Sequence, residues 1–151
     1  MKVQLASIAS RPGTGPAQAL LEEYLRRTQP YLSMEAPVYR NESALFAALA
    51  KLKTRTAPVA LLLDARGEQL SSESLAALLD GHKVASTQNL VFAIGPASGW
   101  SPEIRNEARA QQRLFSLGRI TLPHELARVV LAEQIYRAAT ILAGHPYHCG
   151  H

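Results

Sequence analysis

The chain has one cysteine in 151 residues, so it cannot form an intramolecular disulfide. This excludes the cross-linked frameworks that are typical of small secreted proteins. No stretch approaches about 18 uninterrupted apolar residues, so we expect no membrane-spanning helix and no membrane partner. Residues 1–13 contain one lysine but lack the long apolar core and cleavage site of a signal peptide. We therefore expect a cytoplasmic protein.

Two well-known phosphate-binding loops are also missing. Neither G-x-G-x-x-G nor G-x-x-x-x-G-K-[ST] occurs in the sequence, so dinucleotide-binding and P-loop interpretations lose their main support. We find no internal repeat, low-complexity segment or linker, and the length suits one domain with one core. The sequence therefore predicts a single domain over residues 1–151.

What the chain does have is a basic excess made mostly of arginine. The net charge is +4, with twelve arginines against four lysines. Arginine is the better residue for bidentate phosphate contacts. The excess is either a solubilising charge or the mark of a polyanionic partner, with nucleic acid as the first candidate.

Apolar runs of strand length alternate with segments of helical spacing. We expect strands at 2–9, 32–39, 58–64, 89–94 and 113–117, and helices at 16–27, 42–53, 72–81, from 102, and 123–143. Such alternation predicts an α/β fold with a parallel sheet covered by helices. Ligands bind such sheets at the carboxyl ends of the strands, where residues 64–67, 95–99 and 117–122 form glycine-containing loops. Taken alone, glycines in such positions more often form simple turns.

The last expected helix has two apolar stripes. Leu126, Val129, Val130, Glu133 and Arg137 share one stripe, and Ala127, Leu131, Ile135, Ala138 and Leu142 share the other. A helix that is apolar on two sides is buried on both, in a core or in a subunit interface. Glu133 and Arg137 have the spacing of an ion pair, which is either a structural bridge or part of a site.

The chain closes with HPYHCGH, residues 145–151, which holds three of the five histidines and the only cysteine. His145, His148, Cys149 and His151 offer enough donors for zinc in principle. They crowd into seven residues with no second ligand pair elsewhere, so we expect no metal. Two alternatives remain, a frayed tail of no consequence and an arm that completes an active site.

Residues 116–148 read SLGRITLPHELARVVLAEQIYRAATILAGHPYH, and this segment resembles the signature of the RlmH family of bacterial ribosomal large-subunit methyltransferases. EEYLRR at 22–27, LLLDARG at 61–67 and FAIGPASGWS at 92–101 occur in the family's order, so the resemblance spans nearly the whole chain. It implies a SPOUT-class α/β knot fold with a C-terminal trefoil knot, a homodimer, and S-adenosylmethionine as methyl donor. The implied substrate is N3 of a pseudouridine in the 23S rRNA of the assembled ribosome.

The resemblance also implies which residues line the S-adenosylmethionine pocket: Leu63, Gly95, Leu117, Gly118, Arg119, Ile120, Thr121 and Leu122. Two positions depart from the family pattern. Pro96 stands where the family usually has a second glycine, and proline removes an N–H donor. The tip Cys149-Gly150-His151 replaces the lysine or arginine with which family members tend to stop.

The chemistry itself suggests further site residues. The N3–H of pseudouridine must lose its proton, so a cation should stabilise the anion and a base should accept the proton. Arg128 and Arg137 are the candidate cations. His148, Tyr147 and His124 are the candidate bases, although His124 at a helix start also fits a structural role. We expect Tyr147 and His148 to form an arm beside the methyl group of the cofactor.

Two sets of arginines are candidates for holding RNA. Arg105, Arg109 and Arg113 fall at i, i+4 and i+8 and predict one basic stripe, and Arg26-Arg27 adds a second patch. Both sets also fit ordinary solvated helix faces. Two other functions stay open: a ribosome-binding module of the same fold without turnover, and a SPOUT RNA methyltransferase with a different target nucleotide.

Overall fold

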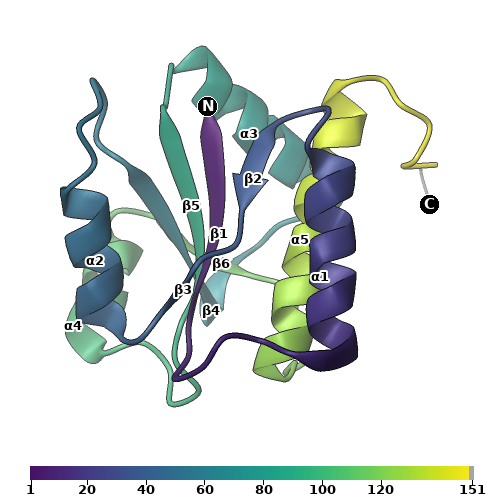
Figure 1. Ribbon diagram of the computed structural model, residues 1–151. Coiled ribbons are helices and arrows are strands. Elements are labelled where there is room, and N and C mark those ends of the chain that lie inside the picture. The colour runs from purple at the N-terminus through teal and green to yellow at the C-terminus, as the bar shows by residue number, and fades with distance from the viewer. Residues whose placement is uncertain (150–151) are drawn as a thin grey trace.

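The computed structural model describes residues 1–149, and the predictions that concern Gly150 and His151 lie outside these residues. A central parallel sheet is flanked by helices on both faces (Figure 1). The elements in chain order are β1 (Lys2–Ile8), α1 (Gly15–Thr28), β2 (Ser33–Glu35), β3 (Val38–Tyr39), α2 (Glu42–Ala50), β4 (Val59–Gln69), α3 (Ser72–Val84), β5 (Asn89–Ile94), α4 (Pro102–Ala110), β6 (Leu114–Ser116) and α5 (His124–Leu142).

The sheet has the order β2-β1-β5-β4-β6, with β3 also pairing with β1, and every pairing is parallel. This confirms the predicted parallel α/β fold. The expected single strand at 32–39 is wrong, because β2 and β3 are separate short strands along the same edge of β1. Pro37 stands between them and has no N–H to donate to a ladder. Its carbonyl oxygen instead accepts a hydrogen bond from the Ser7 amide at 3.1 Å.

Strand β4 runs past the residue at which we expected it to end. Leu63 and Glu68 both pair with Phe115, so residues 64–67 bulge out of the ladder and the pairing then resumes. Gly67 makes this possible, since a Cβ at that position would overlap the backbone of Phe115. The expected loop at 64–67 is therefore a bulge inside a longer strand.

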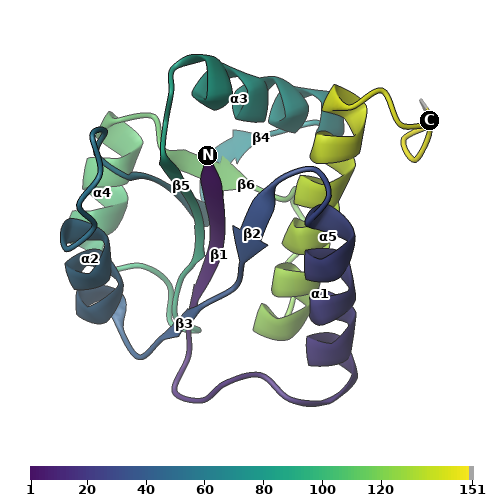
Figure 2. The ribbon, with the colours of Figure 1, turned by 45° about the horizontal axis from the view of Figure 1, so that its top comes forward.

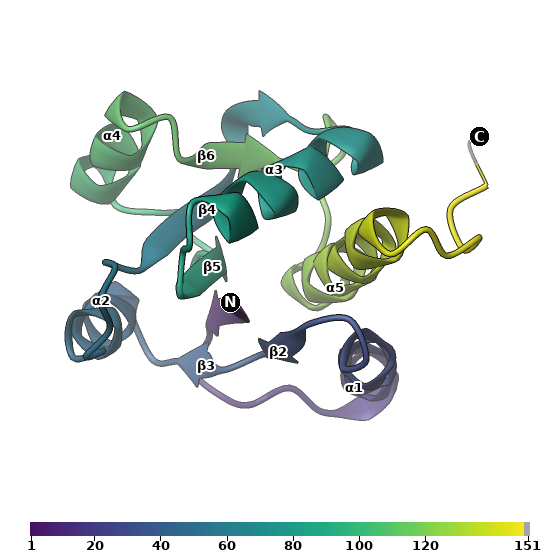
Figure 3. The ribbon, with the colours of Figure 1, turned by 90° about the horizontal axis from the view of Figure 1, so that it is seen from above.

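The helices divide unequally between the two faces of the sheet. Helices α1, α3 and α5 cover one face, and α2 and α4 cover the other (Figures 2 and 3). Strand β5 serves both cores, because Leu90 and Phe92 point to the first face while Val91 and Ala93 point to the second.

Helix α5 packs between α1 and α3, with Leu131 and Ile135 fully buried. Its second predicted stripe is thus mostly core. The first stripe is only partly covered, since the Leu126 side chain is 48% exposed. No helix in residues 1–149 is long and apolar enough to cross a bilayer. The predicted trefoil knot stays a prediction.

Helix α4 ends earlier than the predicted arginine stripe requires. Its last residue is Ala110, and Gln112 adopts a left-handed φ of 55° that turns the chain. Arg113 follows this turn, and its carbonyl oxygen accepts a hydrogen bond from the Leu62 amide at 2.8 Å. The prediction of one helical stripe through Arg113 is therefore wrong.

Candidate functional site

A cavity of about 420 Å³ lies at the carboxyl ends of β4 and β6. The whole predicted segment from Leu117 to Leu122 lines it, together with Leu63. Other lining residues were not among the predicted contacts: Asp64, Ala65, Gln69, Ser116 and Ala127. The bulge in β4 brings Asp64 and Ala65 to this wall, and nothing in the sequence pattern indicated that the strand would resume after it.

The segment 117–122 owes its shape to Gly118 and Ser116. Gly118 has a φ of 118°, a conformation that side-chain-bearing residues rarely adopt, and open space lies where its Cβ would be. The Ser116 hydroxyl donates to the Gly118 carbonyl at 2.8 Å and accepts from the Gly118 amide at 3.1 Å. This fixed turn presents backbone at the cavity wall, where it can contact a ligand closely.

Gly95, which the resemblance placed in the pocket, is not among the residues that line this cavity. A Cβ at Gly95 would come within 2.8 Å of the Trp100 indole, so the glycine makes room for that ring. Trp100 in turn donates its Nε1–H to the Leu63 carbonyl at 3.0 Å. Gly95 therefore leaves room for the ring that holds the backbone of Leu63, a residue of the cavity wall. Pro96 lies at a separate hollow, and its carbonyl oxygen accepts from the Gly99 amide at 2.8 Å.

Two side chains of the C-terminal tail, those of Tyr147 and His148, form hydrogen bonds with side chains of α5. The Glu133 carboxylate is the centre of this contact. Its Oε1 accepts from Arg137 Nε at 3.0 Å, from Arg137 Nη2 at 2.7 Å and from the Tyr147 hydroxyl at 3.0 Å. The Tyr147 ring also packs edge-on against Tyr136, with 4.7 Å between centroids. We call Glu133, Arg137, Tyr147 and His148 the tail cluster.

His148 bridges two elements from within the tail cluster. Its Nδ1 lies 3.1 Å from Arg137 Nη1, and its Nε2 lies 2.9 Å from Glu73 Oε1 at the start of α3. A guanidinium can only donate, so Nδ1 accepts and Nε2 carries the hydrogen that is donated to Glu73. The backbone amide of Glu73 and then this bond from His148 lower the pKa of the Glu73 carboxyl. Sequence pattern could not have found Glu73, because 75 residues separate it from His148.

Tyr147 is held in its neutral form. Burial, and next the hydrogen bond to Glu133, raise the pKa of its phenol well above the ordinary value. A phenol with a raised pKa keeps its proton at neutral pH, so it donates a hydrogen bond and does not act as a base. Both ring nitrogens of His148 are engaged in this conformation, so His148 can accept a proton only after Nδ1 is released from Arg137.

A second hollow lies beside the cavity. It has a volume of about 300 Å³, shares the lining residues Ser116 and Leu117 with the cavity, and extends to Gln134. Gln134 Nε2 donates to Glu133 Oε2 at 2.8 Å, and its Oε1 accepts from the Ser72 hydroxyl at 2.7 Å. Gln134 therefore links the hollow beside the predicted cofactor segment to Glu133 of the tail cluster.

Arg128 lies elsewhere. It precedes Arg137 by nine residues, about 13 Å along the axis of α5. Its side chain is 5% exposed, and Nη1 donates to Gln18 Oε1 at 3.0 Å while Nε has no partner within residues 1–149. His124 is in the same first turn, and burial, then Arg128, lower the pKa of its imidazole. Of the residues predicted to be catalytic, Arg137, Tyr147 and His148 thus lie in the tail cluster, whereas Arg128 and His124 lie near the start of α5.

The arginines predicted to hold RNA differ in their surroundings. Arg105 reaches the Trp100 carbonyl at 3.5 Å, and Arg109 lines a hollow beside the β4 bulge. Arg26 and Arg27 both pair with Glu23, with 2.9 Å between Arg27 Nε and Glu23 Oε1.

No group of three or more histidine, cysteine or acidic side chains in residues 1–149 is placed to hold a metal ion. His145 Nδ1 accepts from the Tyr147 amide at 3.2 Å, and Cys149 is exposed. His151, the remaining donor of the zinc alternative, lies outside the described residues.

A family model described as "Predicted SPOUT methyltransferase" matches residues 1–148. The chain belongs to the SPOUT methyltransferase family. This confirms the resemblance, and relatives called "Ribosomal RNA large subunit methyltransferase H" agree with it. One from Koribacter versatilis is 50% identical over 137 residues, covering 89% of each chain. Another from Deinococcus radiodurans is 37% identical over 150 residues, covering 99% of this chain and all of the relative.

A solved member of the SPOUT fold gives the same architecture. The crystal structure of the ribosomal RNA small subunit methyltransferase E from Neisseria gonorrhoeae, bound to S-adenosyl methionine, matches with a TM-score of 0.50 at 14% identity. The match covers 94% of this chain but 66% of that longer one. At this identity the likeness supports the fold alone.

Proposed function

We propose that this chain is an S-adenosylmethionine-dependent methyltransferase that acts on N3 of a pseudouridine in 23S rRNA of the ribosome. The observation that carries the proposal is the cavity lined by the 117–122 segment, whose neighbouring hollow ends at Gln134, a hydrogen-bond partner of Glu133 in the tail cluster. It puts a methyl-donor pocket and a polar cluster for proton handling next to each other. The names of the close relatives support the ribosomal large subunit as the target.

The residues of the cavity fit S-adenosylmethionine. A volume of about 420 Å³ is in the range of small-molecule sites. Asp64 supplies a carboxylate for ribose hydroxyls or an ammonium, Arg119 suits a carboxylate, and Leu117, Ile120 and Leu122 offer apolar walls for a purine. When bound, this cofactor supplies an electrophilic methyl group on a sulfonium. The protein then has to position the nucleophile and remove its proton.

Arg137 and His148 are the residues we propose for that task. Two nitrogens of Arg137 hold Glu133, which leaves Nη1 as the donor directed at His148. If the substrate displaces the imidazole, Nη1 can stabilise the N3 anion and Nδ1 of His148 is released to accept the proton. Tyr147, kept neutral, serves as a donor and as an aromatic surface. We assign Arg128 a positioning role between α5 and α1, through its hydrogen bond to Gln18.

We further propose a homodimer formed through the outer stripe of α5. Leu126 is 48% exposed and Leu20 on α1 is 46% exposed, which leaves apolar surface that a second copy would cover. Val130 is partly exposed on the same stripe and is the residue to change. Ile135 is fully buried within the chain, so replacing it would disturb the core and would not report on dimerisation.

We propose that Arg26, Arg27, Arg105, Arg109 and Arg113 contact the RNA substrate, and that the protein works in the cytoplasm, where ribosomes are assembled. The departure from the family pattern at Pro96 is one feature that would favour the alternative function, a ribosome-binding module without turnover. That residue lies at a hollow separate from the cavity, so it removes no contact from the proposed pocket.

Calorimetric titration with S-adenosylmethionine tests the pocket. The parent protein should bind the cofactor, and Gly118→Ala should weaken binding about tenfold because strain of about 1–3 kcal/mol distorts the turn. Gly81→Ala is the matched control, since Gly81 lies within α3 with open space around its Cα. No binding by the parent, or equal binding by both variants, would contradict the proposed pocket.

A further inference from the structure

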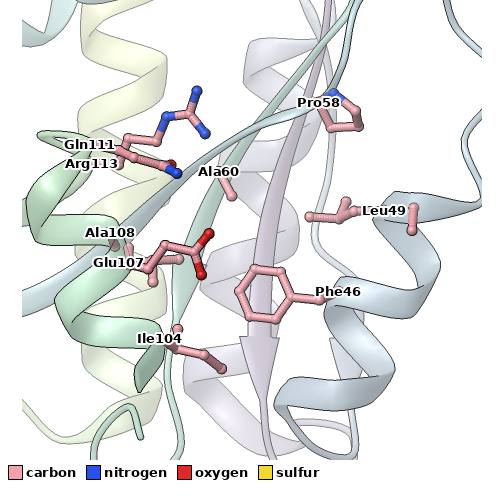
Figure 4. A pocket seen from close by; sticks show the side chains of 11 residues that line it. Phe46, Leu49, Pro58, Ala60, Ile104, Glu107, Ala108, Gln111 and Arg113 are labelled. Atoms are coloured by element: carbon pink, nitrogen blue, oxygen red, sulfur yellow. The ribbon is translucent and has the colours of Figure 1, made fainter. Parts of the chain in front are cut away.

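A groove of about 330 Å³ lies on the opposite face of the sheet from α5, between α2 and α4 (Figure 4). None of its lining residues belongs to the cavity at 117–122 or to the tail cluster. The proposed methyl transfer makes no use of it. The groove opens between these two helices, because α2 packs on β1 and β3 while α4 packs on β4 and β6.

The walls of the groove are apolar, and one of them is aromatic. Phe46 enters from α2, Ile104 stands opposite on α4, and Ala60 forms part of the floor (Figure 4). Phe46 is partly exposed, and its ring lies tilted against that of Trp100, with 6.4 Å between centroids. A partly exposed aromatic ring on the wall of a groove offers a surface on which a base can stack.

One end of the groove carries three different hydrogen-bonding groups. Glu107 offers an acceptor and Figure 4 shows its carboxylate directed into the groove towards Phe46. Gln111 offers both a donor and an acceptor, and Arg113 offers donors only. Proteins read the edge of an unstacked base with this kind of mixed set while an aromatic ring takes its face.

Three cations lie next to lining residues of the groove in the sequence. Lys51 follows lining residue Ala50, and Lys53 and Arg55 lie on the segment that leads to lining residue Pro58. None of the three forms an ion pair within residues 1–149. Unpaired positive charge close to an aromatic slot favours single-stranded nucleic acid, with phosphates at the cations and a base in the slot.

We propose that this groove binds an unstacked nucleobase of the RNA substrate, with the base on Phe46 and its polar edge at Glu107, Gln111 and Arg113. The proposal takes its partner, RNA, from the proposed function but does not depend on methyl transfer. The groove would act as a second anchor on the far face of the sheet, separate from the nucleotide that is methylated.

Fluorescence anisotropy with a fluorescein-labelled single-stranded RNA decamer of mixed sequence tests the groove, without cofactor present. Phe46→Leu keeps the apolar contacts with the core but removes the stacking face, and should weaken binding about tenfold. Arg113→Gln should weaken it similarly. Lys83→Gln is the matched control, because it removes one exposed positive charge on α3, on the other face of the sheet.

The affinity for S-adenosylmethionine should be the same in all three variants, which also reports on folding. RNA affinity of Phe46→Leu and Arg113→Gln equal to that of Lys83→Gln would overturn the proposal. So would a loss of ribosome binding without any loss of RNA binding, because the groove would then hold a ribosomal protein. Weakened RNA binding supports the groove even if the parent protein methylates nothing, so the two proposals fail separately.

Discussion

Glu133 is the residue on which the tail cluster depends most. Its carboxylate accepts two N–H groups of Arg137, the Tyr147 hydroxyl and the Gln134 amide. Glu133→Gln keeps the shape of the side chain and one acceptor oxygen, so it removes the charge with little change in packing. The Arg137 guanidinium then stays in place with its counter-charge gone.

The size of this effect follows from burial. The side chains of Arg137 and Glu133 are 24% and 17% exposed. Exposed pairs contribute about 0.2–1 kcal/mol, and breaking a fully buried pair costs about 3–5 kcal/mol. For a pair that is mostly but not fully buried we expect a loss of about 2 kcal/mol in the free energy of unfolding. In a protein of this size that corresponds to a fall in Tm of about 4–8 °C.

Thermal unfolding followed by circular dichroism at pH 7 measures the shift. Glu22→Gln is the control, because Glu22 is an exposed helical glutamate whose side chain meets only the neutral Gln18 amide. The Tm of this control should change by less than about 1 °C. If Glu133→Gln shifts the Tm no further than Glu22→Gln does, the tail cluster does not hold the tail on α5.

Four further outcomes are expected. A chain stopped after Gly144 should fold and bind S-adenosylmethionine but methylate ribosomes at least about a hundredfold more slowly, as measured by incorporation of labelled methyl groups; an unchanged rate would remove the tail from the site. Val130→Asp should convert the dimer to a monomer by native mass spectrometry, and a parent protein with the mass of one chain would refute the dimer. Burial, and then Arg128, lower the pKa of His124, so the neutral imidazole stabilises the fold at pH values above the ordinary pKa of about 6.5. This contribution is lost as the pH falls below that value. The Tm of the parent should therefore fall more between pH 7 and pH 5 than the Tm of His124→Gln, and parallel curves of Tm against pH would contradict the assignment. Changing Arg105 and Arg109 to Glu should weaken ribosome binding and flatten its salt dependence, whereas an unaltered salt slope would make them ordinary surface residues.

Local patterns were sufficient where burial alone decides the structure. The apolar run at 89–94 forms β5 over the predicted residues, and the long last helix begins one residue from its expected start. These segments are buried, so their hydrophobic spacing reports directly on their conformation. The same reasoning failed at Pro37, which divides an apparent strand, and at Gly67, which lets β4 resume after its bulge. Both outcomes depend on which backbone lies opposite, and the local sequence does not contain that information.

The candidate site shows a similar division. The 117–122 segment was predicted from family resemblance, and the structure makes it the wall of a cavity. Spacing along the helix predicted the Glu133–Arg137 pair, which forms with 2.7 Å between Arg137 Nη2 and Glu133 Oε1. The bond from His148 to Glu73 joins parts of the chain that only the tertiary fold brings together.

Methylation of ribosomes from a strain that lacks this protein tests the proposed function most directly. The purified chain and S-adenosylmethionine carrying a labelled methyl group are added, and the rRNA is digested and mapped by mass spectrometry. The label should appear on N3 of one pseudouridine in 23S rRNA, and replacing Gly118 with alanine should reduce it. Label in small-subunit rRNA, on another nucleotide, or on no nucleotide at all would contradict the proposed function.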